Sequence, residues 1–285
     1  MEKLLKKDYL DFISHTDTLE ISGVKLPILK GRLKKNCTPQ DFKTERTTMW
    51  SFPERGTWAT HEYNSKFRGN WAPQVARNLL LLYSKEGDTI LDPFVGSGTT
   101  VIEAKILGRN GIGVDINRDI ALLAYDRIIF KCKPDIEKEG KIKLYIGDAR
   151  KLDKIKDSSI DFIATHPPYA GIIRYSNEKI PEDLSNITSP NKFVREFIPA
   201  IEEFYRVLKP NSYCAVLIGD TRKRRHIVPL GYMVMREFLN VGFMIKEHII
   251  KAQHNMKGTR ERWGGTYDFL LIGHEHLFVF RKPEK

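Results

Sequence analysis

The chain has 285 residues, and its 47 Lys and Arg exceed its 36 Asp and Glu by 11, a surplus that favours a polyanionic partner such as nucleic acid. Hydrophobic residues at 41% and charged residues at 29% are typical of a globular protein and exclude a disordered or fibrous one. The sequence contains no apolar run long enough to span a membrane and no signal-peptide core, so we expect a cytoplasmic protein that does not bind membranes.

The three cysteines are Cys37, Cys132 and Cys214. They are far apart in the sequence and match no metal-ligand spacing. We therefore expect three reduced structural thiols without a disulfide framework, and no metal site.

Residues 1–62 show no regular alternation of strands and helices. We assign them to an N-terminal extension that packs on the rest of the chain or binds substrate, with an amphipathic opening and a possible strand at 18–21. The stretch 47–61 is rich in aromatic residues, arginine and turn residues, and it includes Trp50 and Trp58. Such aromatics can stack on bases or can pack within a compact loop, and the sequence leaves both alternatives open.

Strands and helices alternate regularly from residue 63 to 285, which predicts one catalytic domain with a mostly parallel sheet and helices on both faces. The last two strands are joined by a loop, so we expect one antiparallel strand at an edge of a seven-stranded, Rossmann-like α/β sheet. The expected strands are 88–92, 111–116, 143–148, 159–164, 213–220, 243–251 and 275–281. The expected helices are one that includes Val75 and Tyr83, followed by 99–108, 118–131, 191–208 and 229–241.

The first of these strands leads into a glycine-rich turn, Asp92-Pro93-Phe94-Val95-Gly96-Ser97-Gly98-Thr99-Thr100, and then into a helix. Glycine lets the backbone turn tightly and lets a ligand approach the amide groups of a helix N-terminus. By itself the turn is equally compatible with a tight connection that binds nothing.

Acidic residues follow the glycine turn at the ends of the next two strands, where open α/β sheets bind their ligands. Asp115 lies about twenty residues beyond the turn, a spacing that suits hydrogen bonds to ribose hydroxyls, and Asp148 follows the third strand. The turn lacks the GxGxxG spacing, and no P-loop lysine follows it, which argues against a nicotinamide enzyme and against an NTPase. A nucleoside ligand without a pyrophosphate fits better, and S-adenosylmethionine is the common one.

The fourth strand runs into Thr165-His166-Pro167-Pro168-Tyr169. Proline has no N–H and a fixed φ, so the carbonyl groups around this turn can face a pocket without local hydrogen bonds. An exocyclic amine there could donate to a backbone carbonyl and to a side-chain acceptor, with the ring of Tyr169 stacked on the base. Alone, a Pro-Pro-Tyr sequence is equally an ordinary turn.

Together, the glycine turn and the Thr165–Tyr169 motif resemble the exocyclic amino-methyltransferases of nucleic acids, the N4-cytosine and N6-adenine DNA methylase family, whose core RNA cytidine N4 methyltransferases also use. The resemblance covers about residues 63–282 and implies a class I methyltransferase fold dependent on S-adenosylmethionine. Residues 67–73 match the segment that closes over the methionine end of the cofactor. Asp115 matches the acid that holds the ribose, and Asp148 matches the acid near the adenine amine.

The cofactor-binding residues implied by the resemblance are Asn70, Trp71, Asp92, Pro93, Phe94, Gly96, Gly98, Thr99, Thr100, Asp115, Ile116, Asp148 and Ala149. The implied catalytic residues are Thr165, His166, Pro167, Pro168 and Tyr169.

The resemblance implies that the target base is flipped out of its stack and that its amine attacks the sulfonium methyl in line. Adenine enzymes of the family typically have Asp or Asn before the Pro-Pro pair, and cytosine enzymes typically have Ser. His166 matches neither, but Thr165 resembles the cytosine form, so we expect N4 of cytosine as the target. His166 can serve as an acceptor or proton sink, or can only shape the turn.

The chain has no room for the large target-recognition segment that DNA methylases of this family usually have. RNA recognition works largely through loops, splayed bases and the backbone, so we expect structured RNA, such as ribosomal RNA, to be favoured over DNA. DNA methylation of the restriction-modification type is the first alternative, and a catalytically silent cofactor-binding module is the second. One or two methyl groups, and a monomer or a homodimer, are all compatible with the sequence.

Cationic and aromatic side chains outside the cofactor motifs are the candidates for binding nucleic acid. They are Trp50, Trp58, Arg68, Arg174, Tyr175, Arg222, Lys223, Arg224 and Arg225.

Overall fold

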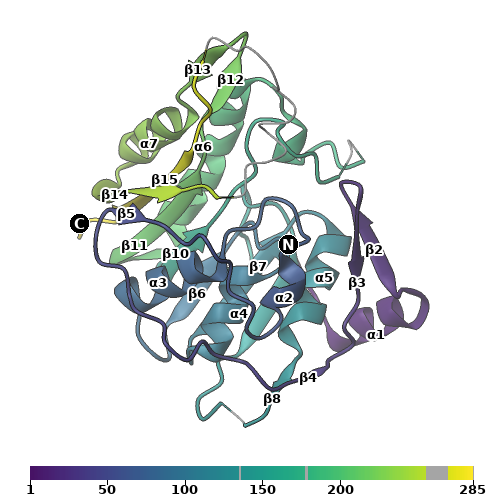
Figure 1. The fold of residues 1–285 in the computed structure, drawn as a ribbon. Helices are drawn as coiled ribbons and strands as arrows, with labels where there is room; N and C mark the ends of the chain where they lie inside the picture. The colour runs from purple at the N-terminus through teal and green to yellow at the C-terminus, as the bar shows by residue number, and fades with distance from the viewer. Residues whose placement is uncertain (135, 177–178, 255–268, 285) are drawn as a thin grey trace.

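The computed structural model describes residues 1–134, 136–176, 179–254 and 269–284 (Figure 1). Its centre is a nine-stranded sheet in the order β1-β9-β7-β6-β10-β11-β15-β14-β5. The seven predicted strands are β6 (Thr89–Asp92), β7 (Asn110–Asp115), β9 (Ile142–Ile146), β10 (Ile160–Thr165), β11 (Leu208–Ile218), β14 (Met244–Ala252) and β15 (His274–Arg281). Two short strands of the N-terminal extension, β1 (Glu2–Lys3) and β5 (Met49–Trp50), form the two edges of the sheet.

The expected antiparallel strand is present, but not at the edge of the sheet. β15 lies between β11 and β14 and pairs antiparallel with both. Beyond it, β14 is covered by β5, with which it pairs parallel. The position differs from the expectation because two strands joined by a loop pair directly with each other, and this pairing does not determine which of the two reaches the edge.

Two layers of helices cover the sheet, as predicted. The helices are α3 (Pro73–Tyr83), α4 (Thr99–Ile106), α5 (Arg118–Ile128), α6 (Pro190–Val207) and α7 (Leu230–Val241). Ile90 and Phe162 belong to the buried cluster of α3 side chains, whereas the next residues along the same strands, Leu91 and Ile163, belong to the cluster of α6 and α7. This alternation is the period of a strand that is buried on both faces.

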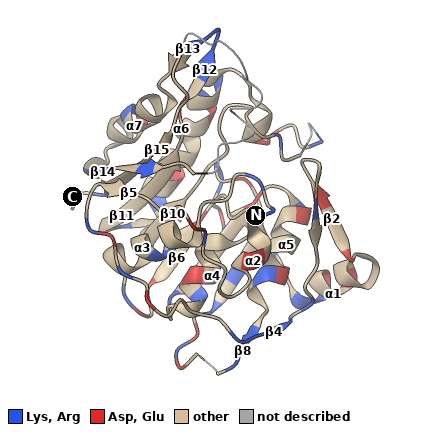
Figure 2. Ribbon diagram, in the orientation of Figure 1, with Lys and Arg blue, Asp and Glu red and all other residues tan. Residues whose placement is uncertain are grey.

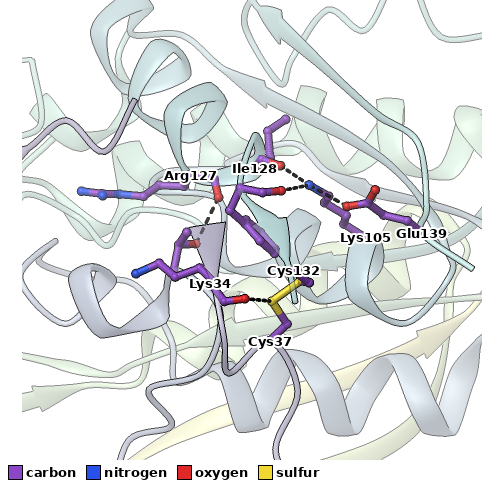
Figure 3. The surroundings of a disulfide bond; sticks show 9 residues. Lys34, Cys37, Lys105, Arg127, Ile128, Cys132 and Glu139 are labelled. Atoms are coloured by element: carbon purple, nitrogen blue, oxygen red, sulfur yellow. Dashed lines mark hydrogen bonds and ion pairs between the residues drawn. A yellow bond between two sulfur atoms is a disulfide. The ribbon is translucent and has the colours of Figure 1, made fainter. Parts of the chain in front are cut away.

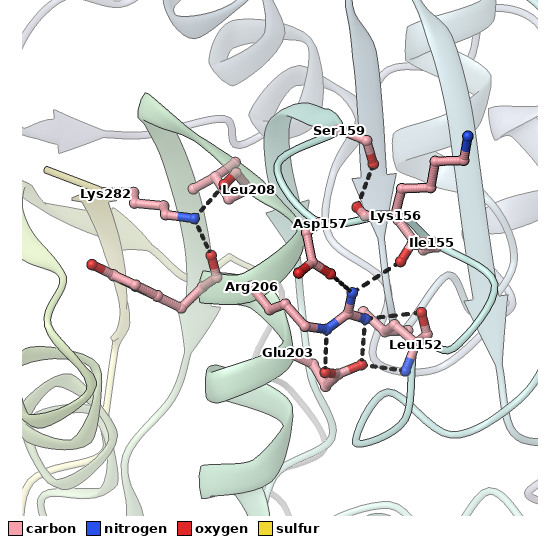
Figure 4. A network of polar contacts seen from close by, with 10 residues as sticks. Leu152, Ile155, Lys156, Asp157, Ser159, Glu203, Arg206, Leu208 and Lys282 are labelled. Atoms are coloured by element: carbon pink, nitrogen blue, oxygen red, sulfur yellow. Dashed lines mark hydrogen bonds and ion pairs between the residues drawn. The ribbon is translucent and has the colours of Figure 1, made fainter. Parts of the chain in front are cut away.

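The C-terminal turn of α6 is fixed to the loop that leads into β10 (Figure 4). Arg206 donates to the carboxylates of Glu203 and Asp157, and to the carbonyl oxygens of Leu152 and Ile155, over 2.5–3.0 Å. Planar guanidinium groups make such multiple contacts with defined geometry. The clamp therefore fixes the start of the strand whose far end is the predicted catalytic motif.

The N-terminal extension runs along the core, from α1 (Lys6–His15) and the hairpin of β2 (Thr18–Ile21) and β3 (Val24–Pro27) to α2 (His61–Asn64) (Figure 1). Its short strand β4 (Leu33–Lys34) pairs with β8 (Lys131–Cys132). Buried polar groups join it to the helices: the hydroxyl of Tyr9 donates to Asp126 over 2.8 Å, and the indole N–H of Trp58 donates to Glu103 over 2.7 Å. Buried carboxylates need such donors, so these bonds tie the extension to α4 and α5.

A disulfide bond joins the extension to the core (Figure 3). Cys37 and Cys132 are bonded, with their Cα atoms 5.9 Å apart, so the prediction of reduced thiols is wrong for these two residues. The pairing of β4 with β8 brings the two cysteines together across a sequence separation of 95, which residue spacing alone does not reveal. Cys214, in β11, is free and buried. Among the described residues, no helix is both long and apolar enough to cross a bilayer.

Candidate active site

A cavity opens at the carboxyl ends of β6, β7, β9 and β10 and encloses about 770 Å³, part of it open to solvent. Eleven of the predicted cofactor residues line it: Asn70, Trp71, Asp92, Pro93, Phe94, Gly96, Thr99, Asp115, Ile116, Asp148 and Ala149. His166 and Pro168 of the predicted catalytic motif line the same cavity. The two motifs, about 70 residues apart in sequence, therefore meet at one site.

Gly98 and Thr100, also predicted to bind the cofactor, do not line the cavity but stabilise the glycine turn. Gly98 is the N-cap of α4 and has a left-handed conformation, with φ of +92°, which favours glycine. Thr100 is fully buried, and its hydroxyl donates to Asp92 over 2.6 Å.

Asp92 joins the two motifs. Its carboxylate accepts hydrogen bonds from the hydroxyl of Thr100 and, over 2.7 Å, from the hydroxyl of Thr165 at the end of β10. Burial raises the pKa of Asp92 to about 6, although these hydrogen bonds act in the opposite direction. Because the side chain of Thr165 is buried and bonded to Asp92, it holds the two strand ends together and does not line the cavity.

Asp115 ends β7, and its carboxylate lines the cavity. It accepts from the backbone N–H groups of Gly96, over 3.1 Å, and Asn117, over 2.9 Å. Burial raises the pKa of Asp115 to about 7, more than these hydrogen bonds lower it. A carboxylate held in this way can accept further hydrogen bonds from ligand hydroxyls.

Asp148 lies two residues beyond the end of β9 and is fixed by Arg150. The guanidinium of Arg150 donates to both carboxylate oxygens of Asp148 over 2.7–3.0 Å, and to the carbonyl oxygen of Glu182 over 2.6 Å. Arg150 thus links the acid to the segment 182–184, which forms another part of the cavity wall.

Two buried polar atoms in residues that line the cavity have no hydrogen-bond partner in the described part of the chain. They are Oγ1 of Thr99, at the N-terminus of α4, and Nδ1 of His166. Unsatisfied buried polar groups are rare in native proteins and often mark a site that a ligand completes. Polar ligands therefore fit this cavity, and the unpaired hydroxyl of Thr99 suits a nucleoside such as S-adenosylmethionine.

His166 lines the cavity, and Tyr169, which does not line it, is bonded to His166. The ring of His166 lies 6.0 Å from that of Trp71 with an interplanar angle of 28°, and its Nε2 is hydrogen-bonded to the hydroxyl of Tyr169. Burial lowers the pKa of His166 to about 4, so the imidazole is neutral at pH 7. Tyr169 packs against Gly219, where an added Cβ would lie 3.0 Å from the tyrosine ring.

The structure adds cavity-lining residues that sequence reasoning missed. They are Asn117, Ile120, Gly147, Glu182, Asp183 and Leu184; the cavity-lining residues Phe67, Gly69 and Val95 lie in the segment 67–73 and the glycine turn, which the sequence already assigns to the cofactor. Asn117 could have been found, because it follows Asp115 by two residues and caps α5. The segment 182–184 has no local sequence signal, since only the tertiary fold brings this loop to the cavity.

Trp50 and Trp58 are 1% and 6% exposed, so the prediction that they contact nucleic acid is wrong. The indole N–H of Trp50 donates to the carbonyl oxygen of Thr47 over 2.8 Å, and that of Trp58 donates to the buried Glu103. The alternative of a compact, packed loop is therefore the correct one.

Tyr175 and Arg68, also predicted to bind nucleic acid, meet beside the cofactor cavity. The hydroxyl of Tyr175 donates to the carbonyl oxygen of Arg68 over 2.9 Å, and its ring stacks on that of Phe67 at 5.7 Å. An added Cβ at Gly69 would lie only 2.0 Å from the tyrosine hydroxyl. Tyr175 lines the cavity, so this close packing forms part of its wall. Arg174, next to it, is exposed.

The basic run 222–225 forms a hairpin of β12 (Thr221–Lys223) and β13 (His226–Val228), and Figure 2 shows cationic residues at its tip. Arg224 and Arg225 have φ of 49° and 69°, the left-handed pair that a two-residue hairpin turn requires. Lys223 and both of these arginines are exposed. Arg222 instead donates to the carbonyl oxygen of Leu270 over 2.6 Å and lies over the ring of Phe269.

Among the described residues, no group of three or more His, Cys, Asp or Glu could hold a metal ion. The polar groups that meet in the cavity, such as those of Asp115 and His166, are hydrogen-bond donors and acceptors suited to an organic ligand.

A family model described as DNA methylase matches residues 6–126 and 160–285. M.MjaI, a Type II methyltransferase of Methanocaldococcus jannaschii, is 36% identical over 167 residues, which cover 49% of this chain and 55% of that protein. M2.DpnII, a Type II methyltransferase of Streptococcus pneumoniae, is 52% identical over 54 residues, which cover 19% of this chain and 20% of that protein. The matches thus span about half or less of the length of these relatives.

A solved S-adenosylmethionine-dependent methyltransferase from Methanosarcina mazei superposes with a TM-score of 0.51 at 18% identity, covering 73% of this chain and 98% of that one. The cyclase SpnF superposes with the same TM-score of 0.51 at 15% identity, covering 76% of this chain and 84% of that one. At these identities the likeness is one of fold, and it confirms the predicted Rossmann-like class I architecture. The reaction has to be argued from the site.

Proposed function

We propose that this chain, which belongs to the DNA methylase family, transfers a methyl group from S-adenosylmethionine to an exocyclic amine of a DNA base. The observation that supports this most strongly is the bond between Thr165 and Asp92, which joins the glycine turn to the motif Thr165–Tyr169 at one cavity. A cofactor site and an amine-accepting turn on neighbouring strand ends suit direct transfer between two bound substrates.

DNA is the polymer that we propose, in place of the structured RNA favoured by the sequence. The family model is described as DNA methylase, and the curated relatives are Type II methyltransferases. These findings favour the DNA alternative. The exposed cations Lys223, Arg224 and Arg225 of the hairpin would contact phosphates, which give affinity without sequence information.

S-adenosylmethionine supplies a methyl group on a sulfonium sulfur, ready for attack by a nucleophilic nitrogen. In this chain Asp115 would accept hydrogen bonds from the ribose hydroxyls, and Asp148 would accept a hydrogen bond from the adenine amine. The hydroxyl of Thr99, which is buried without a partner among the described residues, would be satisfied by the same ligand. Asn70 and Trp71 would contact the methionine end.

N4 of cytosine is the target that we propose, with N6 of adenine as the alternative. His166 stands where cytosine enzymes typically have serine, and like serine it is neutral at pH 7, because burial holds the pKa of His166 at about 4. Its nitrogen and the carbonyl of Pro167 would accept the two amine hydrogens. This orients the nitrogen lone pair and raises its nucleophilicity.

The proposal is tested by incubating the protein with labelled S-adenosylmethionine and with DNA or RNA, followed by nucleoside analysis. We expect label in DNA cytosine at N4, and a loss of about 100-fold or more in the His166→Ala variant with unchanged cofactor binding. The matched control is His15→Ala, because His15 is exposed on α1. Label confined to RNA contradicts the choice of polymer. Label in neither polymer refutes the proposed function and favours the alternative of a catalytically silent module.

A further inference from the structure

Three strands contribute to a chain of polar contacts that ends at His166. Lys251, on β14, donates to Oε2 of Glu275 over 2.8 Å, and Oε1 of Glu275, on β15, accepts from the hydroxyl of Tyr169 over 2.9 Å. The oxygen of Tyr169 is in turn hydrogen-bonded to Nε2 of His166, in the turn after β10. Neither Glu275 nor Lys251 belongs to the glycine turn or to the Pro-Pro motif.

The direction of these hydrogen bonds follows from the protonation of their members. Burial would raise the pKa of Glu275, but the charge of Lys251 and the hydrogen bonds from Lys251 and Tyr169 outweigh it and hold that pKa below its usual range, so the carboxylate can only accept. Burial raises the pKa of Tyr169 far above neutrality, so its single proton is present and goes to Glu275. The phenol oxygen then has to accept from His166, which places the imidazole proton on Nε2.

A neutral imidazole with its proton on Nε2 has a bare Nδ1. Nδ1 of His166 is the buried atom that has no partner among the residues that the structure describes. The side chain lines the cofactor cavity and is stacked beside Trp71, so the ring is held in place. In serine hydrolases a buried carboxylate fixes the tautomer of a histidine by a hydrogen bond; here Glu275 has the corresponding place, with Tyr169 between it and His166.

We propose that Glu275, acting through Tyr169, is a positioning residue that fixes His166 with Nδ1 free to accept a hydrogen of the target amine. This inference rests on the proposed function. In the transfer step the amine nitrogen forms a bond to the methyl carbon, the carbon–sulfur bond breaks, and its electron pair stays on sulfur. The proton released by the amine passes to Nδ1, and the imidazolium later gives it to water.

Glu275 has a second effect, on the basicity of His166. Its carboxylate oxygen lies 3.9 Å from Nε2 of His166, where it favours the cationic ring, whereas Lys251 and Arg55 disfavour it. Among the described residues, these groups and Tyr169 are the titratable and charged residues that act on the imidazole. Neutralising Glu275 therefore lowers the pKa of His166 further and weakens it as a proton acceptor.

The test compares Glu275→Gln with the matched control Glu247→Gln, a partly exposed residue of β14. We expect kcat of Glu275→Gln to fall about 10- to 100-fold with the KM for S-adenosylmethionine unchanged, because Glu275 lies outside the cofactor cavity. Tyr169→Phe removes only the hydroxyl and should lower kcat similarly. The double variant should be no slower than the slower single variant, because both changes break the same chain of contacts.

The second readout is the imidazole ¹⁵N spectrum, with the His166 signals among the eight histidines assigned by their loss in His166→Ala. We expect the proton on Nε2 in the wild type, and on Nδ1 or exchanging between both nitrogens in Glu275→Gln. Wild-type kcat or an unchanged tautomer in both Glu275→Gln and Tyr169→Phe would overturn the inference. A wild-type protein that methylates nothing refutes the proposed function instead, and the spectrum still decides whether Glu275 orients His166.

Discussion

The protonation of Asp115 should control the affinity of the protein for S-adenosylmethionine. Burial raises the pKa of this carboxyl to about 7 in the free protein, so only part of it is ionised at neutral pH. An ionised carboxylate accepts from both ribose hydroxyls, whereas the protonated group is a poorer acceptor. Binding therefore favours loss of the proton, and affinity should rise as the pH rises.

The size of the effect follows from the ionised fraction. For a pKa of about 7 that fraction rises from about 9% at pH 6 to about 91% at pH 8, a tenfold gain or about 1.4 kcal/mol. Replacing Asp115 with Asn should remove this gain and weaken binding at pH 8 by about 10- to 100-fold, the contribution of hydrogen bonds to a charged group.

The assay is calorimetric titration with S-adenosylmethionine at pH 6, 7 and 8. The ratio of wild-type to Asp115→Asn affinity is the quantity to compare, because titration of the ligand's own groups cancels in it. Asp119→Asn is the control, since Asp119 is exposed in the first turn of α5. A ratio that stays constant between pH 6 and pH 8 would refute the assignment of Asp115 to the ribose.

Three further predictions concern the extension and the hairpin. The Cys37→Ser variant should lose about 4.7 kcal/mol of unfolding free energy in urea titrations, because the bridge spans a sequence separation of 95; an unchanged midpoint under oxidising conditions would contradict this. Trp50→Phe should lower stability and leave DNA affinity within about twofold, so a selective loss of DNA binding would contradict its burial. Lys223→Ala and Arg224→Ala should each weaken DNA binding for all sequences and reduce the salt slope by about 0.9, and an unaltered slope would exclude phosphate contacts.

The sheet and most of the cofactor site could be predicted because their signals are local. The apolar runs fix the strands, and the acids at strand ends meet at one edge by the geometry of parallel sheets. Asp92 and Asp115 are therefore located by their sequence context, and the cavity confirms that they lie together.

The remaining features depend on contacts between distant segments. Cys37 meets Cys132 through the pairing of β4 with β8, and Trp58 is buried in an apolar cluster with its indole N–H bonded to Glu103 on α4. Glu275 reaches Tyr169 from a strand more than 100 residues further along the chain. Composition and spacing contain no information about such pairings, which tertiary packing determines.

The product of the reaction tests the central claim most directly. DNA from cells that produce the wild-type protein, and from cells that produce His166→Ala, would be digested to nucleosides and analysed by mass spectrometry. The proposed function predicts N4-methyldeoxycytidine in the first sample and its absence from the second. Equal amounts of N4-methyldeoxycytidine in the two samples, or a new methyl group only in RNA, would contradict it.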